Sequence, residues 1–303
     1  MIPATGTMAG KVCLVTGTTS GIGKAVALGL ARMGATVVMA ARDPVRGEAA
    51  MAEIKAASGN ERVELLLADL ASLRQVRRLA QQFTASHRQL HVLINNAGTM
   101  FPASATTEDG FDTTFAVNHL APFLLTNLLL DTLKASAPAR IVNITSVAHY
   151  GTIDFTTLQR GARWRGPFPG WQAYRQSKLA SILLTYELAR RLDGTGVTAN
   201  CVHPGMVDTN VGMESQGFIA RLINRYRPAV VRWLFTLPWS FLLTPEEGAR
   251  SSLFLASSPE VEGVSGRYFV KTVQARSSRR SLDPALAQRL WRADAELVGL
   301  DGR

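Results

Sequence analysis

Short apolar runs alternate along the chain with longer stretches whose apolar positions recur every three to four residues. The short runs are rich in β-branched residues, which is typical of buried strands, and cover residues 11–16, 36–41, 63–68, 90–94, 140–145, 197–202 and 267–270. The periodic stretches predict helices over 24–33, 44–58, 72–86, 111–133 and 171–192. Because no internal repeat or break in composition interrupts the alternation, it predicts an α/β fold, a doubly wound parallel central sheet of about seven strands flanked by helices.

Composition and charge narrow the class of protein. The 303 residues are 47% apolar and 18% charged, which is typical of a globular chain rather than a disordered one. A net charge of +10 would suit nucleic acid, an anionic membrane surface or an anionic ligand. The arginines are scattered and form no basic stripe interleaved with aromatic residues, so we expect no nucleic-acid partner.

The cysteines and the absence of visible targeting segments indicate in which cellular compartment the protein is expected. Cys13 and Cys201 each lie in a predicted strand and form no disulfide framework, which favours a reducing environment. The first ten residues carry neither the basic nor the apolar segment of a secretory signal. The nearest candidate for a membrane span, Ala229 to Leu243, is short and is broken by Arg232 and Pro238. We therefore expect a cytoplasmic protein.

A glycine-rich turn follows the first predicted strand. Residues 16–23 read Thr-Gly-Thr-Thr-Ser-Gly-Ile-Gly and lead into a predicted helix. Gly17 would allow a tight turn, Gly21 would let the backbone approach a pyrophosphate, and Gly23 would let the helix pack on the strand. The helix N-terminus would offer phosphates its unpaired N–H groups and the positive end of its dipole. Strand, turn and helix in this order indicate a dinucleotide site.

The second predicted strand ends at Arg42, where a dinucleotide fold places the adenosine ribose. An acidic residue at this point binds the 2′-hydroxyl, whereas a guanidinium matches the oxygens of a 2′-phosphate. Arg42 therefore favours NADP(H), with NAD(H) as the alternative and a solvated loop arginine as the other interpretation. Asp43 is suited to cap a helix that begins at Pro44.

Polar and small residues follow the later strands, at the edge of the sheet where the ligand crevice of such a fold lies. Asp69 and Leu70 follow the third strand, and Asp69 would either bind an adenine amino group or simply precede the helix cap Ser72. The small residues in segment 95–98 would let the backbone lie against a ligand. Ser146 stands at the carboxyl end of the fifth strand.

Two polar residues interrupt the apolar helix pattern of residues 111–133. Asn118 is either a satisfied core amide or a functional group, and its surroundings in the sequence leave both interpretations open. His119 has no second metal-binding residue type at a suitable spacing, so we expect a structural histidine and no metal site.

Tyr174 and Lys178 stand four residues apart in the helical stretch 171–192. On a helix their Cβ atoms would lie roughly 5–6 Å apart on one face. An ammonium at that distance would lower the pKa of the phenol and suit it to general acid–base chemistry. A lone pair with this spacing is usually an ordinary surface pair, so its meaning depends on the other motifs.

Taken in order, the motifs resemble those of the short-chain dehydrogenase/reductase superfamily. They are TGxxxGxG at 16–23, NNAG at 95–98, Asn118, Ser146, YxxxK at 174–178 and PG at 204–205. Segments 41–43, 202–205 and 244–249 further resemble the retinol dehydrogenase branch. The resemblance extends over about residues 11–300 and implies a single Rossmann-type domain over 1–303. It implies a core at 10–207, a variable substrate lid at 208–243 and a C-terminal part at 244–303.

The resemblance also implies roles for individual residues. Tyr174 would be the acid/base that exchanges a proton with the substrate oxygen, and Lys178 would lower its pKa and contact the nicotinamide ribose. Ser146 would orient the substrate oxygen, and Asn118 would hold a water in a proton relay behind Lys178. The implied cofactor contacts are Gly17, Thr19, Ser20, Gly21, Ile22, Gly23, Arg42, Asp69, Leu70, Asn95, Ala97, Gly98, Tyr174, Lys178, Pro204, Gly205, Val207 and Thr209.

The function implied is that of an NADP(H)-dependent oxidoreductase acting on a carbonyl/alcohol pair, with a lipophilic aldehyde, ketone or retinoid-like substrate. The alternatives are a steroid or polyketide ketone reductase and a nucleotide-sensing interaction protein without turnover. The intact set Asn118, Ser146, Tyr174 and Lys178 argues against the last.

Substrate choice is expected to lie in the irregular stretch 151–170 and in 212–243. The second stretch mixes basic and aromatic residues, so it forms an amphipathic lid and could also dock peripherally on a membrane. The apolar helices 111–133 and 171–192 could pair between the subunits of a homodimer or homotetramer.

Overall fold

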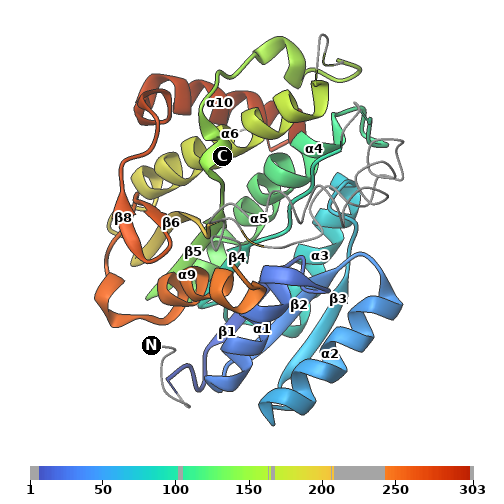
Figure 1. Ribbon diagram of the computed structural model, residues 1–303, viewed down its shortest axis with the longest axis vertical. Helices are drawn as coiled ribbons and strands as arrows, with labels where there is room; N and C mark the ends of the chain where they lie inside the picture. The colour runs from blue at the N-terminus through green and yellow to red at the C-terminus, as the bar shows by residue number, and fades with distance from the viewer. Residues whose placement is uncertain are drawn as a thin grey trace, which may run out of the picture.

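The computed structural model describes residues 7–101, 105–162, 164, 168–205, 207 and 243–300. Its centre is an eight-stranded sheet in the order β3-β2-β1-β4-β5-β6-β7-β8 (Figure 1). The strands are β1 (Val12–Thr16), β2 (Thr36–Ala41), β3 (Val63–Leu67), β4 (Val92–Asn95), β5 (Ala139–Ile144), β6 (Val197–His203), β7 (Tyr268–Val270) and β8 (Val273–Ala275). The α/β class and the mainly parallel sheet are thus confirmed.

The eighth strand is an addition to the sequence prediction. All pairs from β3 to β7 are parallel, whereas β8 returns antiparallel to β7 after a two-residue turn at Lys271, whose φ is 56°. Val273 and Gln274 are exposed, so this edge strand has no buried face and leaves no hydrophobic pattern in the sequence.

Helices cover both faces of the sheet, because alternate strand residues point to opposite sides. Cys13 and Val15 join a core built with α1, α2 and α9, while Leu14 joins the opposite core built with α3, α5, α6 and α10 (Figure 1). The helical elements are α1 (Gly21–Arg32), α2 (Pro44–Ser58), α3 (Leu73–Ser86), α4 (Thr113–Phe115), η1 (Ala116–Leu120), α5 (Ala121–Ala135), η2 (Val147–His149), η3 (Phe155–Leu158), α6 (Pro169–Arg191), α9 (Pro245–Ser257), η5 (Pro259–Val261), η6 (Arg279–Leu282) and α10 (Pro284–Val298).

The order of the strands defines where a ligand can bind. β1 lies between β2 and β4, so the chain leaves β1 toward one side of the sheet and returns on the other. Loops that leave these strands in opposite directions open a crevice at their carboxyl ends. The glycine-rich turn and the segment after β4 both lie at this point.

The predicted helix 111–133 is one continuous helical segment with a π turn in its middle. α4 leads into the π-helical η1, which carries Asn118 and His119, and α5 follows directly. Over Thr113–Ala135 this segment is long and apolar enough to cross a membrane, the one such helix in the described part of the chain. Most of it is buried inside the fold, as expected for a core helix.

The C-terminal helix α10 packs over α5 and α6. Trp291 meets Phe123 edge to face with ring centroids 4.9 Å apart, and His119 Nε2 lies 2.6 Å from Asp294 Oδ2 in a fully buried pair. His119 is therefore structural, as predicted. α10 covers part of α5 and α6, and the possible pairing of these helices between subunits stays a prediction.

Candidate active site

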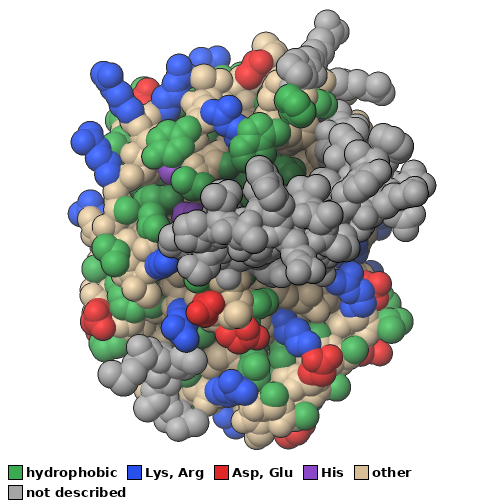
Figure 2. Space-filling view, viewed as in Figure 1, with side chains coloured by type: hydrophobic (Ala, Val, Ile, Leu, Met, Phe, Trp, Pro, Cys, Tyr) green, Lys and Arg blue, Asp and Glu red, His purple; other side chains and the backbone are tan. Residues whose placement is uncertain are grey.

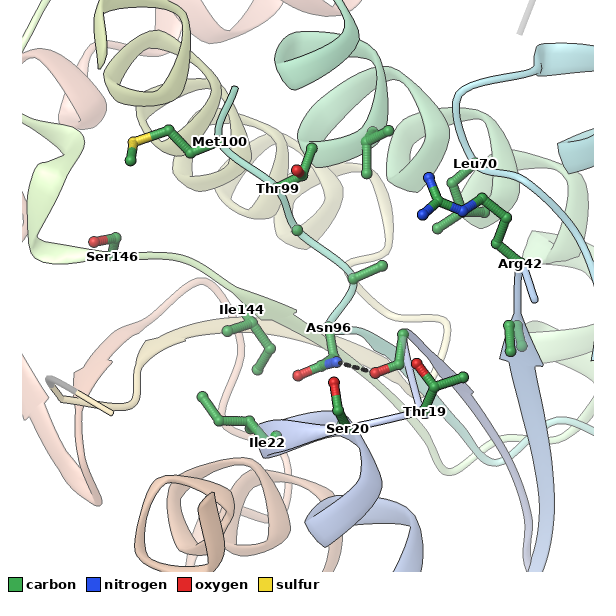
Figure 3. A pocket seen from close by; sticks show the side chains of 18 of the residues that line it. Thr19, Ser20, Ile22, Arg42, Leu70, Asn96, Thr99, Met100, Ile144 and Ser146 are labelled. Atoms are coloured by element: carbon green, nitrogen blue, oxygen red, sulfur yellow. Dashed lines mark hydrogen bonds between the residues drawn. The ribbon is translucent and has the colours of Figure 1, made fainter. Parts of the chain in front are cut away.

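The turn between β1 and α1 requires glycine on steric grounds. Gly17 has φ +72°, and a Cβ there would come within 2.8 Å of Ala97 Cα. A Cβ at Gly23 would come within 2.1 Å of the carbonyl oxygen of Gly17. The side-chain amide of Asn96 donates to the carbonyl oxygens of Thr16, at 2.8 Å, and of Gly17, at 3.2 Å (Figure 3). Asn96 thus braces the turn, a role that the sequence did not reveal.

The N-terminus of α1 is suited to bind an anion. Ser20 is the N-cap but makes no side-chain capping hydrogen bond, and the first turn contains no acidic residue. The first N–H groups of the helix and its positive dipole end are therefore presented to the crevice. A cradle of small residues with this donor set fits the pyrophosphate of a dinucleotide cofactor.

A cavity of about 550 Å³ begins at this turn, within the usual size of a small-molecule site. Arg42 and Leu70 lie at one end, Ser146 and Met100 at the other, and the glycine-rich turn runs between them (Figure 3). The predicted residues that line it are Gly17, Thr19, Ser20, Gly21, Ile22, Gly23, Arg42, Asp69, Leu70, Ala97, Gly98, Ser146, Tyr174, Lys178, Pro204, Gly205 and Val207.

The end of the cavity near β2 carries two arginines. Arg42 follows β2, and Arg46 lines the same cavity one turn into α2. Asp43 is the predicted cap of α2, since it accepts from the backbone N–H of Arg46 at 3.0 Å. Sequence reasoning missed Arg46, although its spacing from Arg42 on a helix capped at Asp43 was a usable signal. This end of the cavity thus carries two guanidinium groups beside the carboxylates of Asp43 and Asp69.

At the opposite end, Tyr174 and Ser146 meet across the cavity. Their side chains are hydrogen-bonded, although Ser146 follows β5 and Tyr174 lies on α6. Burial raises the pKa of Tyr174, and the hydrogen bond with Ser146 lowers it by less. The expected lowering of this pKa by Lys178 is therefore not found, because burial disfavours the phenolate and is the largest cause of the shift.

Lys178 is buried beneath the floor of the same end. Its Nζ lies 5.5 Å from the centre of the Tyr174 ring and donates to the carbonyl oxygen of Ile144 at 3.1 Å. Burial lowers the pKa of Lys178 to about 8. The ammonium has no carboxylate partner among the described residues, so near neutral pH it is a cation held in place by a backbone carbonyl.

Asn118 lies behind Lys178 and is fully hydrogen-bonded. Its Oδ1 accepts from the N–H of Thr99 at 2.7 Å, and its Nδ2 donates to Thr99 O and to Ser177 Oγ at 2.9 and 3.0 Å. It therefore joins the segment after β4 to α6, as the core-amide interpretation predicts. Asn118 does not line the cavity, but both it and Lys178 approach Gly98, whose added Cβ would lie 3.5 Å from Asn118 Oδ1 and 3.6 Å from Lys178 Nζ.

Asn95 was predicted to contact the cofactor, but its side chain lies elsewhere. Its side chain is buried in the sheet layer and donates to Thr126 Oγ1 and Asn143 Oδ1, at 3.1 and 2.8 Å, so it does not line the cavity. As the last residue of β4 it points into the core, and the following Asn96 points toward the crevice, as strand alternation requires. Thr209 and nearly all of segment 212–243 lie outside the described residues.

Further cavity residues were not singled out from the sequence. They include Thr99, Met100 and Phe101 after β4, Val117 of the π turn, Val147 of η2 and His203 at the end of β6. Burial is the main cause that lowers the pKa of His203 to about 4, and nearby His149 and the cations Lys178 and Lys271 lower it further, so its ring is neutral near pH 7. Among the described residues no group of three or more His, Cys, Asp or Glu is placed to hold a metal ion.

This fold and site define a short-chain dehydrogenase. The model of the family described as short chain dehydrogenase matches residues 11–218, and the chain belongs to this family. Within it the chain is retinol dehydrogenase-like, being 44% identical over 310 residues to retinol dehydrogenase 14 of Homo sapiens, across 97% of this chain and 88% of that protein. It is an oxidoreductase that acts on the CH–OH/C=O pair.

Two solved structures are similar to this chain in fold and in sequence. An uncharacterised protein from Mycobacterium paratuberculosis is 33% identical with a TM-score of 0.73, covering 96% of this chain and 94% of that one. The Pseudomonas aeruginosa RhlG/NADP active-site complex is 27% identical with a TM-score of 0.67, covering 94% of this chain and all of that one (100%).

Proposed function

We propose that the protein is an NADP(H)-dependent reductase of lipophilic aldehydes or ketones. The observation that carries the proposal is one continuous cavity with two arginines at one end and the Ser146–Tyr174–Lys178 cluster at the other. A similar solved structure holds NADP in its active site. A bound nicotinamide cofactor supplies the hydride.

Arg42 and Arg46 bind the 2′-phosphate in this proposal. Guanidinium groups match phosphate oxygens with paired N–H donors, whereas the carboxylate of Asp43, which lines the same end of the cavity, already accepts a hydrogen bond as the cap of α2. The N-terminus of α1 holds the pyrophosphate, and Asp69 and Leu70 lie beside the adenine.

Tyr174 donates the proton to the substrate oxygen. Its raised pKa keeps the phenol protonated near neutral pH, which is the form that a carbonyl reduction needs. Ser146 shares a hydrogen bond with Tyr174, so an oxygen placed between the two hydroxyls would be oriented for that transfer. The Lys178 ammonium stabilises the phenolate that remains. Asn118, whose side chain is fully hydrogen-bonded to Thr99 and Ser177, holds the segment after β4 in place behind Lys178.

Apolar side chains around the catalytic end support a lipophilic substrate. Val147, Tyr150, Phe168 and Trp171 are exposed to between 47% and 76%, and the Trp171 ring stacks on Tyr174 with centroids 5.8 Å apart. Apolar side chains also gather in the upper half of the face drawn in Figure 2, beside histidine side chains. Exposed large apolar groups that gather around a site entrance usually mark a binding surface for apolar ligands.

The test is an NADPH-oxidation screen over aldehydes and ketones of graded chain length, with NADH run in parallel. We expect oxidation of NADPH that becomes faster with longer apolar chains. A protein that binds no NADPH and oxidises none with any member of the panel would rule the proposal out. The predicted membrane contact through 212–243 lies outside the described residues, and it remains, with the cytoplasmic location, a prediction that liposome co-sedimentation can test.

A further inference from the structure

His149 connects the turn that carries Ser146 to the C-terminal part of the chain. It is the last residue of η2 and is buried, with 1% of its surface exposed. Its ring is stacked on Tyr150, with centroids 4.6 Å apart, and tilted against Tyr268 of β7 at 5.1 Å. The ring is thus held from two sides and has a single orientation.

Both ring nitrogens of His149 are bonded to backbone groups, and this fixes the position of its proton. Nδ1 lies 2.8 Å from the carbonyl oxygen of Ser146, which can only accept, so Nδ1 donates. Nε2 lies 3.1 Å from the backbone nitrogen of Ser278, which can only donate, so Nε2 accepts. The imidazole must therefore be neutral, and burial lowers its pKa accordingly.

The partner on the far side is itself well anchored. Ser278 precedes η6, and its neighbour Ser277 shares a hydrogen bond of 2.7 Å with the hydroxyl of Tyr186 on α6. Ser281 Oγ lies 2.7 Å from both Ser277 Oγ and Ser278 O. Because a carbonyl oxygen can only accept, Ser281 donates to Ser278 O and accepts from the Ser277 hydroxyl. This serine network gives His149 a fixed point on which to hold the carbonyl of Ser146.

We propose that His149 is a positioning residue for the reaction: its neutral imidazole fixes the backbone of Ser146 against the C-terminal segment and thereby sets the place of the Ser146 hydroxyl. The proposal rests on the catalytic role given to Ser146 above. Ser146 Oγ also accepts from the N–H of Ala148 at 3.2 Å, so a shift of this turn moves both the backbone and the hydroxyl. A displacement of about 1 Å at a reacting group can cost about 100-fold in rate.

Two substitutions separate the two ends of the bridge. An asparagine amide reaches the place of Nδ1, so His149→Asn keeps a donor to Ser146 and loses the bond to Ser278. A glutamine amide reaches the place of Nε2, so His149→Gln keeps an acceptor for Ser278 and loses the bond to Ser146. We expect His149→Gln, which frees the carbonyl of Ser146 directly, to lower kcat for the best aldehyde of the panel by about 10- to 100-fold. His149→Asn loses only the bond to Ser278 and should lower kcat by less. The Kd for NADPH, measured by fluorescence titration, should stay unchanged in both.

A second pair tests the far end even if the histidine variants do not fold. The φ angle of Ser278 is −60°, which proline adopts without strain. Ser278→Pro therefore removes two groups: the backbone N–H that donates to His149 and the side-chain hydroxyl. Ser278→Ala removes the hydroxyl alone and is the matched control. We expect Ser278→Pro to lower kcat more than Ser278→Ala, with equal Kd for NADPH.

The outcomes are distinct. Equal kcat for the two histidine variants, or for the two serine variants, at a temperature where all are folded would overturn the role of His149. A wild-type protein that oxidises no NADPH with any aldehyde or ketone would instead overturn the proposed function on which this role rests.

Discussion

The side-chain carbonyl of Gln176 accepts a hydrogen bond of 2.8 Å from the backbone N–H of Asp154. Its amide nitrogen donates to Thr157 Oγ1 at 3.0 Å, and the neighbouring Arg175 bonds the carbonyl oxygen of Tyr150. The residues between Tyr174 and Lys178 thus anchor the segment that follows Ser146. The helix turn that carries Tyr174, the proposed proton donor, also fixes part of the region expected to select the substrate.

Replacing Gln176 by methionine should therefore change substrate selection more than chemistry. We expect KM for long-chain aldehydes to rise by roughly 5- to 50-fold, because the variant loses two part-buried hydrogen bonds of about 1 kcal/mol each that hold this segment in place, and the N–H of Asp154 is left unpaired. Gln176→Glu keeps an acceptor for Asp154 and is the milder control. Steady-state kinetics over the chain-length series will measure the change, and a fall in kcat with constant KM would speak against this role.

Tyr174→Phe removes the proton donor and little volume. We expect kcat to fall by about 10²- to 10⁴-fold because the proton must then come from water. The Kd for NADPH should remain close to that of the wild type, because the Tyr174 hydroxyl that the substitution removes is hydrogen-bonded to Ser146 rather than placed to hold the cofactor. Single-turnover NADPH oxidation is the measurement, and full activity in this variant would assign the proton transfer to another group.

Arg42→Ala and Arg46→Ala should each weaken NADPH binding without weakening NADH binding. A charge-assisted hydrogen bond is worth about 1.5–3 kcal/mol, so the Kd for NADPH should rise by about 10- to 100-fold for the more important of the two. Arg62→Ala is the control, because Arg62 precedes β3 at the amino edge of the sheet and bonds the carbonyl oxygen of Gly34. Equal losses for both cofactors would place neither arginine at the 2′-phosphate.

Lys178→Met should stabilise the cofactor-free protein at neutral pH. The folded pKa of Lys178 is about 8 against 10.5 for the free side chain, so between these values the unfolded chain binds more protons. The free energy of unfolding of the wild type therefore rises with pH across this window, and at pH 7 the buried ammonium costs up to about 3 kcal/mol.

Thermal unfolding from pH 7 to 10.5 measures this effect. Methionine cannot titrate, so the variant should be more stable by a few degrees at pH 7, and the difference should shrink toward pH 10.5. Lys134→Met, on the exposed end of α5, is the control. A variant that is less stable than the wild type at pH 7 would mean that the bond to Ile144 outweighs the cost of burying the charge.

The sequence predicted those parts of the site that rest on local signals. Gly17 and Gly23 were found because a side chain at either position would collide with backbone, which is a constraint on one residue at a time. Arg42 was found from its place at a strand end. Strands β1 to β7 were found from their apolar runs, which are typical of strands buried on both faces, whereas the exposed β8 was not.

The parts that were missed depend on contacts between distant segments. The sequence around His149 does not indicate a contact with Ser278, because Ser278 lies in a different part of the chain and contributes only its backbone N–H. The π turn at Asn118 leaves the helical periodicity almost unchanged. The pKa of Tyr174 was predicted in the wrong direction because burial, which a sequence does not display, is the largest cause of its shift and raises it.

The position of α10 has a consequence for the order in which the molecule forms. The helices that carry Asn118, Tyr174 and Lys178 are synthesised before the helix that covers them, so a nascent chain holds Phe123 and its neighbours without Trp291. Apolar surface exposed at that stage favours aggregation or chaperone binding. The packing of α10 against α5 and α6 therefore completes this side of the core only after α10 has been synthesised.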